Sequence, residues 1–427
     1  MTGRRGNGMD ELEDSGFRRS AGRERAVGYQ RYVADWEKDP IPGVHNPVEI
    51  GSDGLPTGVE LEQPADEVDS HGAAFPFEPE SIKIETQAST VDLLLSRLRE
   101  ERIDLAPDFQ RRVGIWSDVQ QSRLIESLLL RIPISSFHMA QDADDNWAVV
   151  DGIQRLTSIV RFMAPEAVDM EPLALRGLDY LHDFTGKRYN DLSGRLRIRL
   201  RETQLVVHII QQGTPEDVKF NIFARINTGG MPLTRQEIRH ALVKGDARVF
   251  LADLAEEAVF GEATGWSISN ERMSDREMVL RFLAFRLSTP ADYRQRDFDQ
   301  FLVDTMHRIN QLSLQQRQDE ARQFREAMKS AAGIFGEYAF RKWRGQARKS
   351  PINKALFETV AVNLANLADH ERNALVASGE LVRARFFDLM ADWDFDRAIS
   401  VATGDPKKVQ RRFEDMDKLF RGVLSGD

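Results

Sequence analysis

The sequence predicts an α+β protein, with a small mixed sheet in its first half and an all-helical second half. Two observations carry this prediction. Short alternating or apolar runs that are typical of strands occur between residues 81 and 210, interleaved with amphipathic helical patterns. From residue 246 onward the apolar residues recur almost only at helical spacing. The length of 427 residues suits about two or three domains.

Three segments follow from composition and patterning. Residues 1–78 begin rich in Arg and Gly, turn acidic, and show recurring Pro and Gly without a sustained period. Such a segment is typical of a mostly disordered extension, either solvated or binding a partner, with a short helix expected only at residues 27–36. We expect a domain over residues 79–245 and a helical domain over residues 246–427.

The elements of the first domain are placed by periodicity and by caps. Ser89 or Thr90 can cap a helix that runs through Leu98, while Thr234 and Glu237 form a capping box for a helix that Gly245 stops. Residues 192–201 fit a strand with one arginine face and a helix equally well. Strands are expected at 81–86, 136–140, 147–150 and 205–210, an extended segment at 105–111, and further helices at 119–130, 154–163 and 218–226.

The second domain is expected to contain helices alone. Their patterns lie at 246–260, 274–287, 296–312, 315–341, 352–368, 371–377, 380–393 and 405–424. No repeat of 20–50 residues connects them.

Composition excludes several classes of protein. Cysteine is absent, which rules out disulfides, zinc–thiolate sites, iron–sulfur clusters and cysteine nucleophiles. The eight histidines are scattered, and none are paired at the spacing of a zinc-binding helix. No apolar run suits a membrane span and no secretory signal follows the first arginines, so we expect a cytoplasmic protein that does not bind membranes. The net charge of −10 argues against a generally basic coat but allows a local basic patch.

The segment Asp151–Gly152–Ile153–Gln154–Arg155 joins a strand to a helix. The amides at a helix N-terminus bind phosphate readily, and Gly152 lets a ligand approach the backbone. Arg155 can add a bidentate phosphate contact, while Asp151 can hold a divalent cation or orient a water. Taken alone, the pattern also fits a helix cap at Asp151 with Arg155 in a surface pair.

Two further segments have residues that suit anion binding. Gln110 and Arg111 belong to PDFQRR, where adjacent arginines follow an extended segment. Arg225, Asn227 and Gly230 belong to RINTGG, whose glycines can form a turn or an amide nest. The alternatives are aromatic core residues with solvated arginines in the first segment, and a plain helix C-cap in the second.

In this order, PDFQRR-x-GIW, SRLIESLLLRIPI, VVDGIQRLTSI and FARINTGGMPLTRQEIRHAL resemble the N-terminal domain family of GmrSD-type modification-dependent restriction endonucleases. The resemblance covers about residues 81–245. It implies a ParB/sulfiredoxin-like fold followed by helices, nucleotide binding and hydrolysis at a DGQQR motif, and bacterial defence against phage DNA. The nucleotide-binding residues that it implies are Gln110, Arg111, Gly152, Arg155, Arg225, Asn227 and Gly230.

The catalytic residues implied by the resemblance are Asp151, Gln154 and Arg155. Asp151 would coordinate Mg²⁺ or position a water, Gln154 would orient the attacking water, and Arg155 would hold phosphates of a nucleoside triphosphate. The sequence departs from the family at Ile153, where the motif has a glutamine. Because isoleucine cannot orient a water, hydrolysis is less well supported than binding, and Ile153 could simply face a core.

Many relatives have a C-terminal HNH nuclease domain, which needs clustered His and Asn around a metal. Residues 246–427 contain only His307 and His370, far apart in the sequence. We therefore expect this chain to lack a nuclease of its own, and a separate nuclease subunit to supply any cleavage.

A basic cluster in the second half combines cations with an aromatic ring. Such a combination is typical of nucleic-acid contact, through phosphates and stacked bases. Each such cluster is also typical of a solvated helix face. The DNA-binding residues that this cluster predicts are Arg341, Lys342, Trp343, Arg344 and Lys349.

The sequence thus favours a nucleotide-binding, NTP-hydrolysing sensor subunit that acts on DNA in phage defence. The alternatives are a non-catalytic DNA-binding module with a degenerate nucleotide site, and a ParB-like DNA nuclease. The sequence leaves the oligomeric state open.

Overall fold

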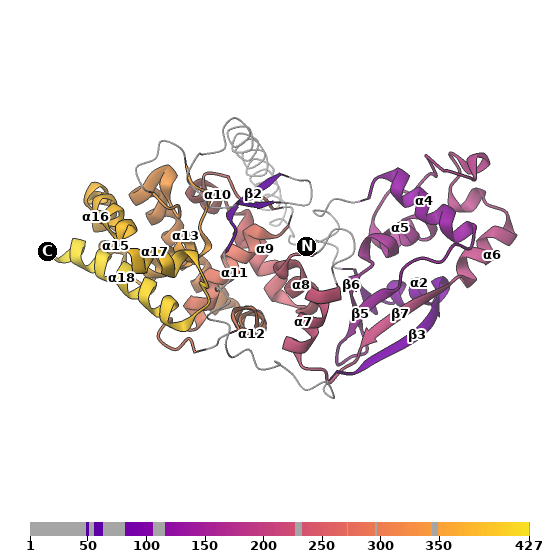
Figure 1. Ribbon diagram of the computed structural model, residues 1–427, viewed down its shortest axis with the longest axis horizontal. Helices are drawn as coiled ribbons and strands as arrows, with labels where there is room; N and C mark the ends of the chain where they lie inside the picture. Colours follow the sequence, from indigo (N-terminus) through magenta and orange to yellow (C-terminus); the bar gives the residue numbers. More distant parts are fainter. Residues whose placement is uncertain are drawn as a thin grey trace, which may run out of the picture. The chain divides into compact units, whose positions relative to one another are not determined.

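The computed structural model describes residues 48–50, 55–62, 82–105, 116–226, 233–270, 272–294, 297–343 and 349–426. The chain divides into two compact units (Figure 1). Residues 73–242 form one, called here the α/β unit. Residues 243–427 together with residues 1–72 form the other, called here the helical unit. A sheet-containing unit followed by helices confirms the predicted α+β class.

A five-stranded mixed sheet forms the centre of the α/β unit. Its strand order is β3-β7-β5-β6-β4. The pairs β3–β7 and β5–β6 are antiparallel, and the pairs β7–β5 and β6–β4 are parallel. The strands are β3 (Ile84–Thr90), β4 (Ile103–Asp104), β5 (Phe137–Gln141), β6 (Trp147–Asp151) and β7 (Gln204–Ile210).

The two faces of this sheet differ in burial. Side chains of a strand alternate between faces, so Phe137 and Met139 on β5 share a face with Val207 on β7, and all three are buried. On the opposite face Ile84 and Val206 are about half exposed, at 48% and 46%. This second face is therefore partly open to solvent, and it is where the candidate site lies.

The helices of the α/β unit begin where the sequence places good caps. Thr90 accepts a hydrogen bond from the Leu93 amide at 3.2 Å, and Ser117 forms a capping box with Gln120. The ambiguous segment 192–201 is helical. The helices are α2 (Val91–Arg99), α4 (Asp118–Leu129), α5 (Ile153–Met163), α6 (Gly194–Glu202), α7 (Glu216–Ile226) and α8 (Arg235–Leu242), with short 3-10 turns at Pro165–Val168, His182–Phe184 and Tyr189–Asp191.

The helical unit has its core around α14 (Lys354–Ala365), in which every residue is buried. Two predicted helices differ in extent. The helix predicted at 315–341 ends at Phe335, and the helix predicted at 246–260 is divided in two at Glu257. A further helix, capped by Asp392, begins at Trp393 and has no counterpart among the predictions. The others are α9 (Asp246–Glu256), α10 (Ala258–Thr264), α11 (Ser274–Leu287), α12 (Phe298–Gln311), α13 (Leu314–Phe335), α15 (Asp369–Ala377), α16 (Gly379–Ala391), α17 (Trp393–Ser400) and α18 (Pro406–Ser425), with a 3-10 turn at Gly336–Tyr338. No helix among the described residues is both long and apolar enough to cross a membrane.

A hairpin from the N-terminal segment is part of the helical unit. Strands β1 (Val48–Ile50) and β2 (Pro56–Glu60) pair antiparallel, and the Glu60 amide donates to the Ile352 carbonyl at 2.8 Å. The segment 1–78 was expected to be mostly disordered, and this part of it is ordered instead. The physical reason is that its acidic side chains are paired with buried cations, for example Glu60 with Lys342 at 2.6 Å. The helix expected at residues 27–36 lies outside the described residues.

Candidate functional site

The strand-to-helix turn at Gly152 has a backbone conformation that only glycine adopts readily. Gly152 is the N-cap of α5 with φ of 94°, and a Cβ there would lie 2.5 Å from the ring of Phe137. The first amides of α5 have no carbonyl acceptor within their own helix. The turn therefore places backbone donors directly after Asp151, packed closely against the Phe137 ring and the Arg155 guanidinium.

The carboxylate of Asp151 is held between a guanidinium and an imidazole. Its Oδ2 accepts a hydrogen bond from Arg155 Nη2 at 3.1 Å and lies 3.3 Å from His138 Nδ1. Burial raises the pKa of Asp151, but the hydrogen bond from His138 and the charge of Arg155 outweigh it, so the pKa lies below its ordinary value. Asp151 is thus a stable anion that orients His138.

Arg155 fastens the loop before β5 to the start of α5. Its Nη1 donates to the carbonyl oxygens of Ser135 and Ser136, and its guanidinium lies 5.0 Å from the centre of the Phe137 ring. Only 13% of the side chain is exposed. A guanidinium has five N–H donors, so the Nε hydrogen and one Nη2 hydrogen remain beyond these three bonds.

Two histidines that sequence reasoning passed over meet beside Asp151. His138 on β5 and His208 on β7 are aligned in parallel register, and their rings stack with centroids 4.9 Å apart. The Nδ1 of His208 lies 2.8 Å from the hydroxyl oxygen of Thr86. Desolvation and the neighbouring His138 lower the pKa of His208. The site therefore contains an Asp151–His138 pair backed by a second imidazole.

The two residues that follow Gly152 are both engaged within the fold. Ile153 is buried, with 4% of its surface exposed, so the side chain that replaces the glutamine of the family motif faces the core. The Oε1 atom of Gln154 accepts a hydrogen bond from the Trp116 amide at 3.2 Å. Gln154 thereby holds the chain just ahead of α4.

Residues 93–244 match the family model described as the GmrSD restriction endonuclease, N-terminal domain. This segment is therefore similar to a GmrSD N-terminal domain and is called here the GmrSD domain. The match covers less than half of the chain, from α2 through α8, and includes the turn at Gly152. No curated protein matches the chain. The family is named for restriction endonucleases.

The other predicted nucleotide-binding residues of the GmrSD domain are only partly described. Gln110, Arg111, Asn227 and Gly230 lie outside the described residues. Arg225 is exposed in the last turn of α7. Within the part of the chain that the structure describes, no three His, Asp or Glu side chains form a group that could hold a metal ion. Among the described side chains, Asp151 therefore has no neighbouring pair of His, Asp or Glu with which it could form a metal site.

Outside the GmrSD domain, the predicted DNA-binding cluster is largely internal. Arg341 and Lys342 are each 2% exposed, so neither can contact DNA in this conformation. Arg341 donates to the Thr264 carbonyl at 3.0 Å, and Lys342 is paired with Glu60. Both cations satisfy buried acceptors in this structure, whereas the sequence predicted that they bind DNA.

The other members of that cluster also have internal or local partners. Trp343 stacks on Tyr338 with ring centroids 5.2 Å apart. Lys349 is about half exposed and pairs with Glu337 at 2.6 Å. Arg344 lies outside the described residues. Of the three cations of this cluster that the structure describes, Lys349 is thus the one at the surface.

Proposed function

We propose that this chain is a nucleotide-binding, NTP-hydrolysing sensor subunit that acts on DNA in cytoplasmic phage defence, with a separate nuclease subunit performing cleavage. The GmrSD domain supports the defence role. The observation that carries the enzymatic part is the turn at Gly152, where helix amides, Arg155 and the Asp151–His138 pair meet.

Phosphate groups would bind at the N-terminus of α5. The amides there carry partial positive charge, and Gly152 allows the backbone to turn so that these amides directly follow Asp151. The Nε and remaining Nη2 hydrogens of Arg155 would add charge-assisted hydrogen bonds. Gln110, Arg111, Arg225, Asn227 and Gly230 are proposed as further contacts, because they belong to the other motifs of the same family.

His138, which lies outside the sequence motif, could act as the base in hydrolysis. With its Nδ1 directed at Asp151, its Nε2 is left as a proton acceptor. Water would attack the terminal phosphorus as the bond to the leaving oxygen breaks, and His138 would take the water proton. His138 would thus supply the activation of water that Ile153 cannot. A bound Mg²⁺ would neutralise phosphate charge, and because Mg²⁺ on a nucleotide usually needs only one or two carboxylates, Asp151 suffices.

The test is phosphate release from a panel of NTPs with Mg²⁺, measured with and without phage DNA. Arg155→Ala should abolish release. His138→Gln should lower kcat by about a hundredfold or more while nucleotide affinity is retained, because a positioned base contributes roughly 10²–10⁴-fold. His208→Gln is the matched control, since it leaves the Asp151–His138 pair in place and should cost far less.

A second candidate function is a DNA-binding module without catalysis. It is favoured by the burial of Ile153 and by the hydrogen bond that occupies Gln154. Folded wild-type protein that binds DNA but releases no phosphate would favour this function. A third, direct DNA cleavage by this domain, would require metal-dependent nicking that Asp151→Ala abolishes.

A further inference from the structure

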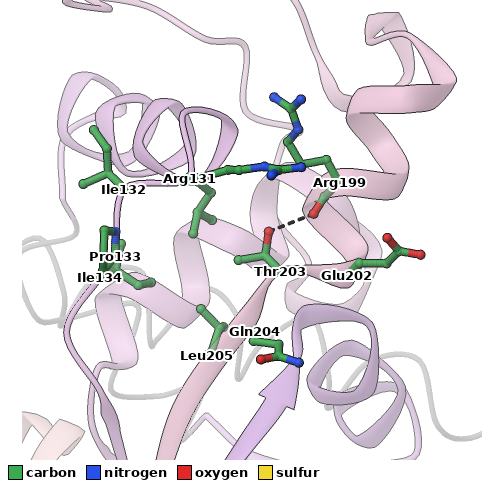
Figure 2. Close-up of a pocket in the computed structure, with 10 residues that line it drawn as sticks. Arg131, Ile132, Pro133, Ile134, Arg199, Glu202, Thr203, Gln204 and Leu205 are labelled. Carbon is green, nitrogen blue, oxygen red and sulfur yellow. Dashed lines mark hydrogen bonds between the residues drawn. The ribbon is translucent and has the colours of Figure 1, made fainter.

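A pocket of about 410 Å³ lies on the α/β unit, away from the turn at Gly152 in sequence and lined by different residues. It is enclosed by the end of α4 with the loop that follows, the end of α6 and the start of β7 (Figure 2). Its apolar part is formed by Leu128, Ile132, Ile134 and Leu205. Ile132 is 47% exposed, so a ligand could remove substantial apolar surface from water there.

Arg131 occupies a position where the fold favours glycine. The Arg131 amide donates to the Leu128 carbonyl at 3.1 Å, and the Ile132 amide donates to the Ser127 carbonyl at 2.8 Å. These are the two hydrogen bonds of the Schellman motif that ends a helix, with Arg131 at its left-handed position and φ of 61°. Glycine is the usual residue there because it has no Cβ. The long cationic side chain is therefore not explained by the needs of the helix end.

Two arginines line this pocket. Figure 2 shows the Arg131 side chain extended toward Arg199, with the Glu202 carboxylate directed away from Arg131. Within the described residues neither arginine forms an ion pair with a carboxylate. Arg199 Nη1 donates to the Leu129 carbonyl at 3.0 Å, which fixes its guanidinium in place. A bound anion could therefore accept charge-assisted hydrogen bonds from both arginines.

We propose that this pocket binds an organic phosphate. The phosphate would lie on Arg131 and Arg199, whose planar guanidinium groups suit bidentate phosphate recognition. The body of the ligand would cover Ile132 and the neighbouring apolar side chains. The volume falls within the range of small-ligand pockets. A nucleotide has both parts, whether it is free or belongs to a DNA strand. The proposal does not depend on hydrolysis at the Asp151 site.

The test compares two substitutions at one position. Arg131→Gly removes the cation and places the favoured residue at the left-handed position, so the melting temperature should stay equal or rise. Arg131→Gln removes the cation and keeps the strained backbone, so the melting temperature should stay equal or fall. Both variants should bind a nucleoside 5′-monophosphate or a short single-stranded oligonucleotide at least about tenfold more weakly than wild type. A loss that both variants share cannot come from unfolding.

Arg195→Gln is the matched control, because Arg195 is an exposed cation of α6 that does not line the pocket. It should leave mononucleotide affinity unchanged. Hydrogen exchange measured with each probe locates the binding site. In the wild type, residues 128–134 and 199–205 should be protected by the ligand. In Arg131→Gly this protection should be lost. Comparing the affinities for the mononucleotide and the oligonucleotide shows whether the pocket prefers a free nucleotide or a DNA strand. Unchanged affinity in both Arg131 variants, or wild-type protection confined to residues 151–156, would overturn the proposal.

Discussion

In the helical unit Arg412 and Glu358 form an ion pair with neither side chain exposed, whereas in the α/β unit Asp151 and His138 meet at an open sheet face, 26% and 19% exposed. The difference separates two uses of charge. A pair that is cut off from water holds the fold together, and removing one partner leaves a costly unpaired charge. A pair at the surface can exchange protons and bind ligands. The number of charged residues in a segment therefore does not tell whether its charges stabilise the fold or form a binding site.

The largest effect is expected from breaking the internal pair. Arg412→Met leaves Glu358 buried with only the more distant Arg281, 3.4 Å away, and should lower the free energy of unfolding by about 3–5 kcal/mol. Urea denaturation followed by circular dichroism measures it. Adding Glu358→Gln should restore part of the loss, because the unpaired charge is then gone. A loss below about 1 kcal/mol in the single variant would contradict the structural role of this pair.

Gly152→Ala tests the α/β unit at its candidate site. The left-handed backbone and the contact with Phe137 should together cost about 1–3 kcal/mol and weaken nucleotide binding. Gly186→Ala is the matched control, since Gly186 has a similar φ of 82° and no atom within 4 Å of a Cβ. Gly186→Ala should lower the free energy of unfolding by less. The difference between the two variants then gives the cost of the contact between the added Cβ and Phe137. Equal losses would mean that Phe137 moves aside freely.

Acidification should weaken the α/β unit before the helical unit. Hydrogen bonding by Arg161 lowers the pKa of Asp118, and three backbone amides outweigh burial to lower that of Glu126. Their contribution is present above their ordinary pKa values and is lost as the pH falls below them. Burial raises the pKa of Glu49 and Glu60, so their protonation favours the folded helical unit as the pH falls.

Hydrogen exchange along a pH series from 6 to 3 measures this order, since it reports on each unit separately. As a control, Glu60→Gln should leave the acid midpoint of the α/β unit unmoved. If both units lost protection from hydrogen exchange at the same pH, their carboxylates would have the same effect on stability, which would contradict the prediction.

The smallest effect concerns a helix cap in the α/β unit. Thr90→Ala removes the oxygen that accepts from the Leu93 amide and should cost about 1 kcal/mol in unfolding free energy, while Thr90→Ser should cost less. Thermal melting checks both. If the two variants were equally destabilised, the hydroxyl would not be the source of the effect.

Elements that depend on neighbours in the sequence were predictable. The capping box of Thr234 and Glu237 is confirmed, because both of its hydrogen bonds join residues three positions apart. The strands at residues 136–140 and 147–150 are also confirmed as a hairpin within one residue of the expected bounds. For residues 192–201 the apolar spacing alone could not decide, and packing selected the helix.

Features that depend on distant partners were not predictable. The pairing of Lys342 with Glu60 joins residues 282 positions apart, so the cation looked like surface charge and the acid looked like part of a disordered tail. The alternation of side chains along a strand could place each of His138 and His208 on the face opposite to its buried neighbours in the sequence. Only the parallel register of β5 and β7, which no local pattern contains, brings the two rings together.

The helical unit is discontinuous in the sequence, and this affects how the chain can fold during synthesis. Glu60 leaves the ribosome long before its partner Lys342, with the whole α/β unit made in between. The α/β unit, being continuous, can fold as soon as its own residues have emerged. Until Lys342 has been made, Glu60 lacks the cation with which it pairs in the folded helical unit. A ribosome stalled before residue 342 should therefore carry a folded α/β unit and a β1–β2 segment that is still open to protease, because the helical unit can close only after its later residues have been made.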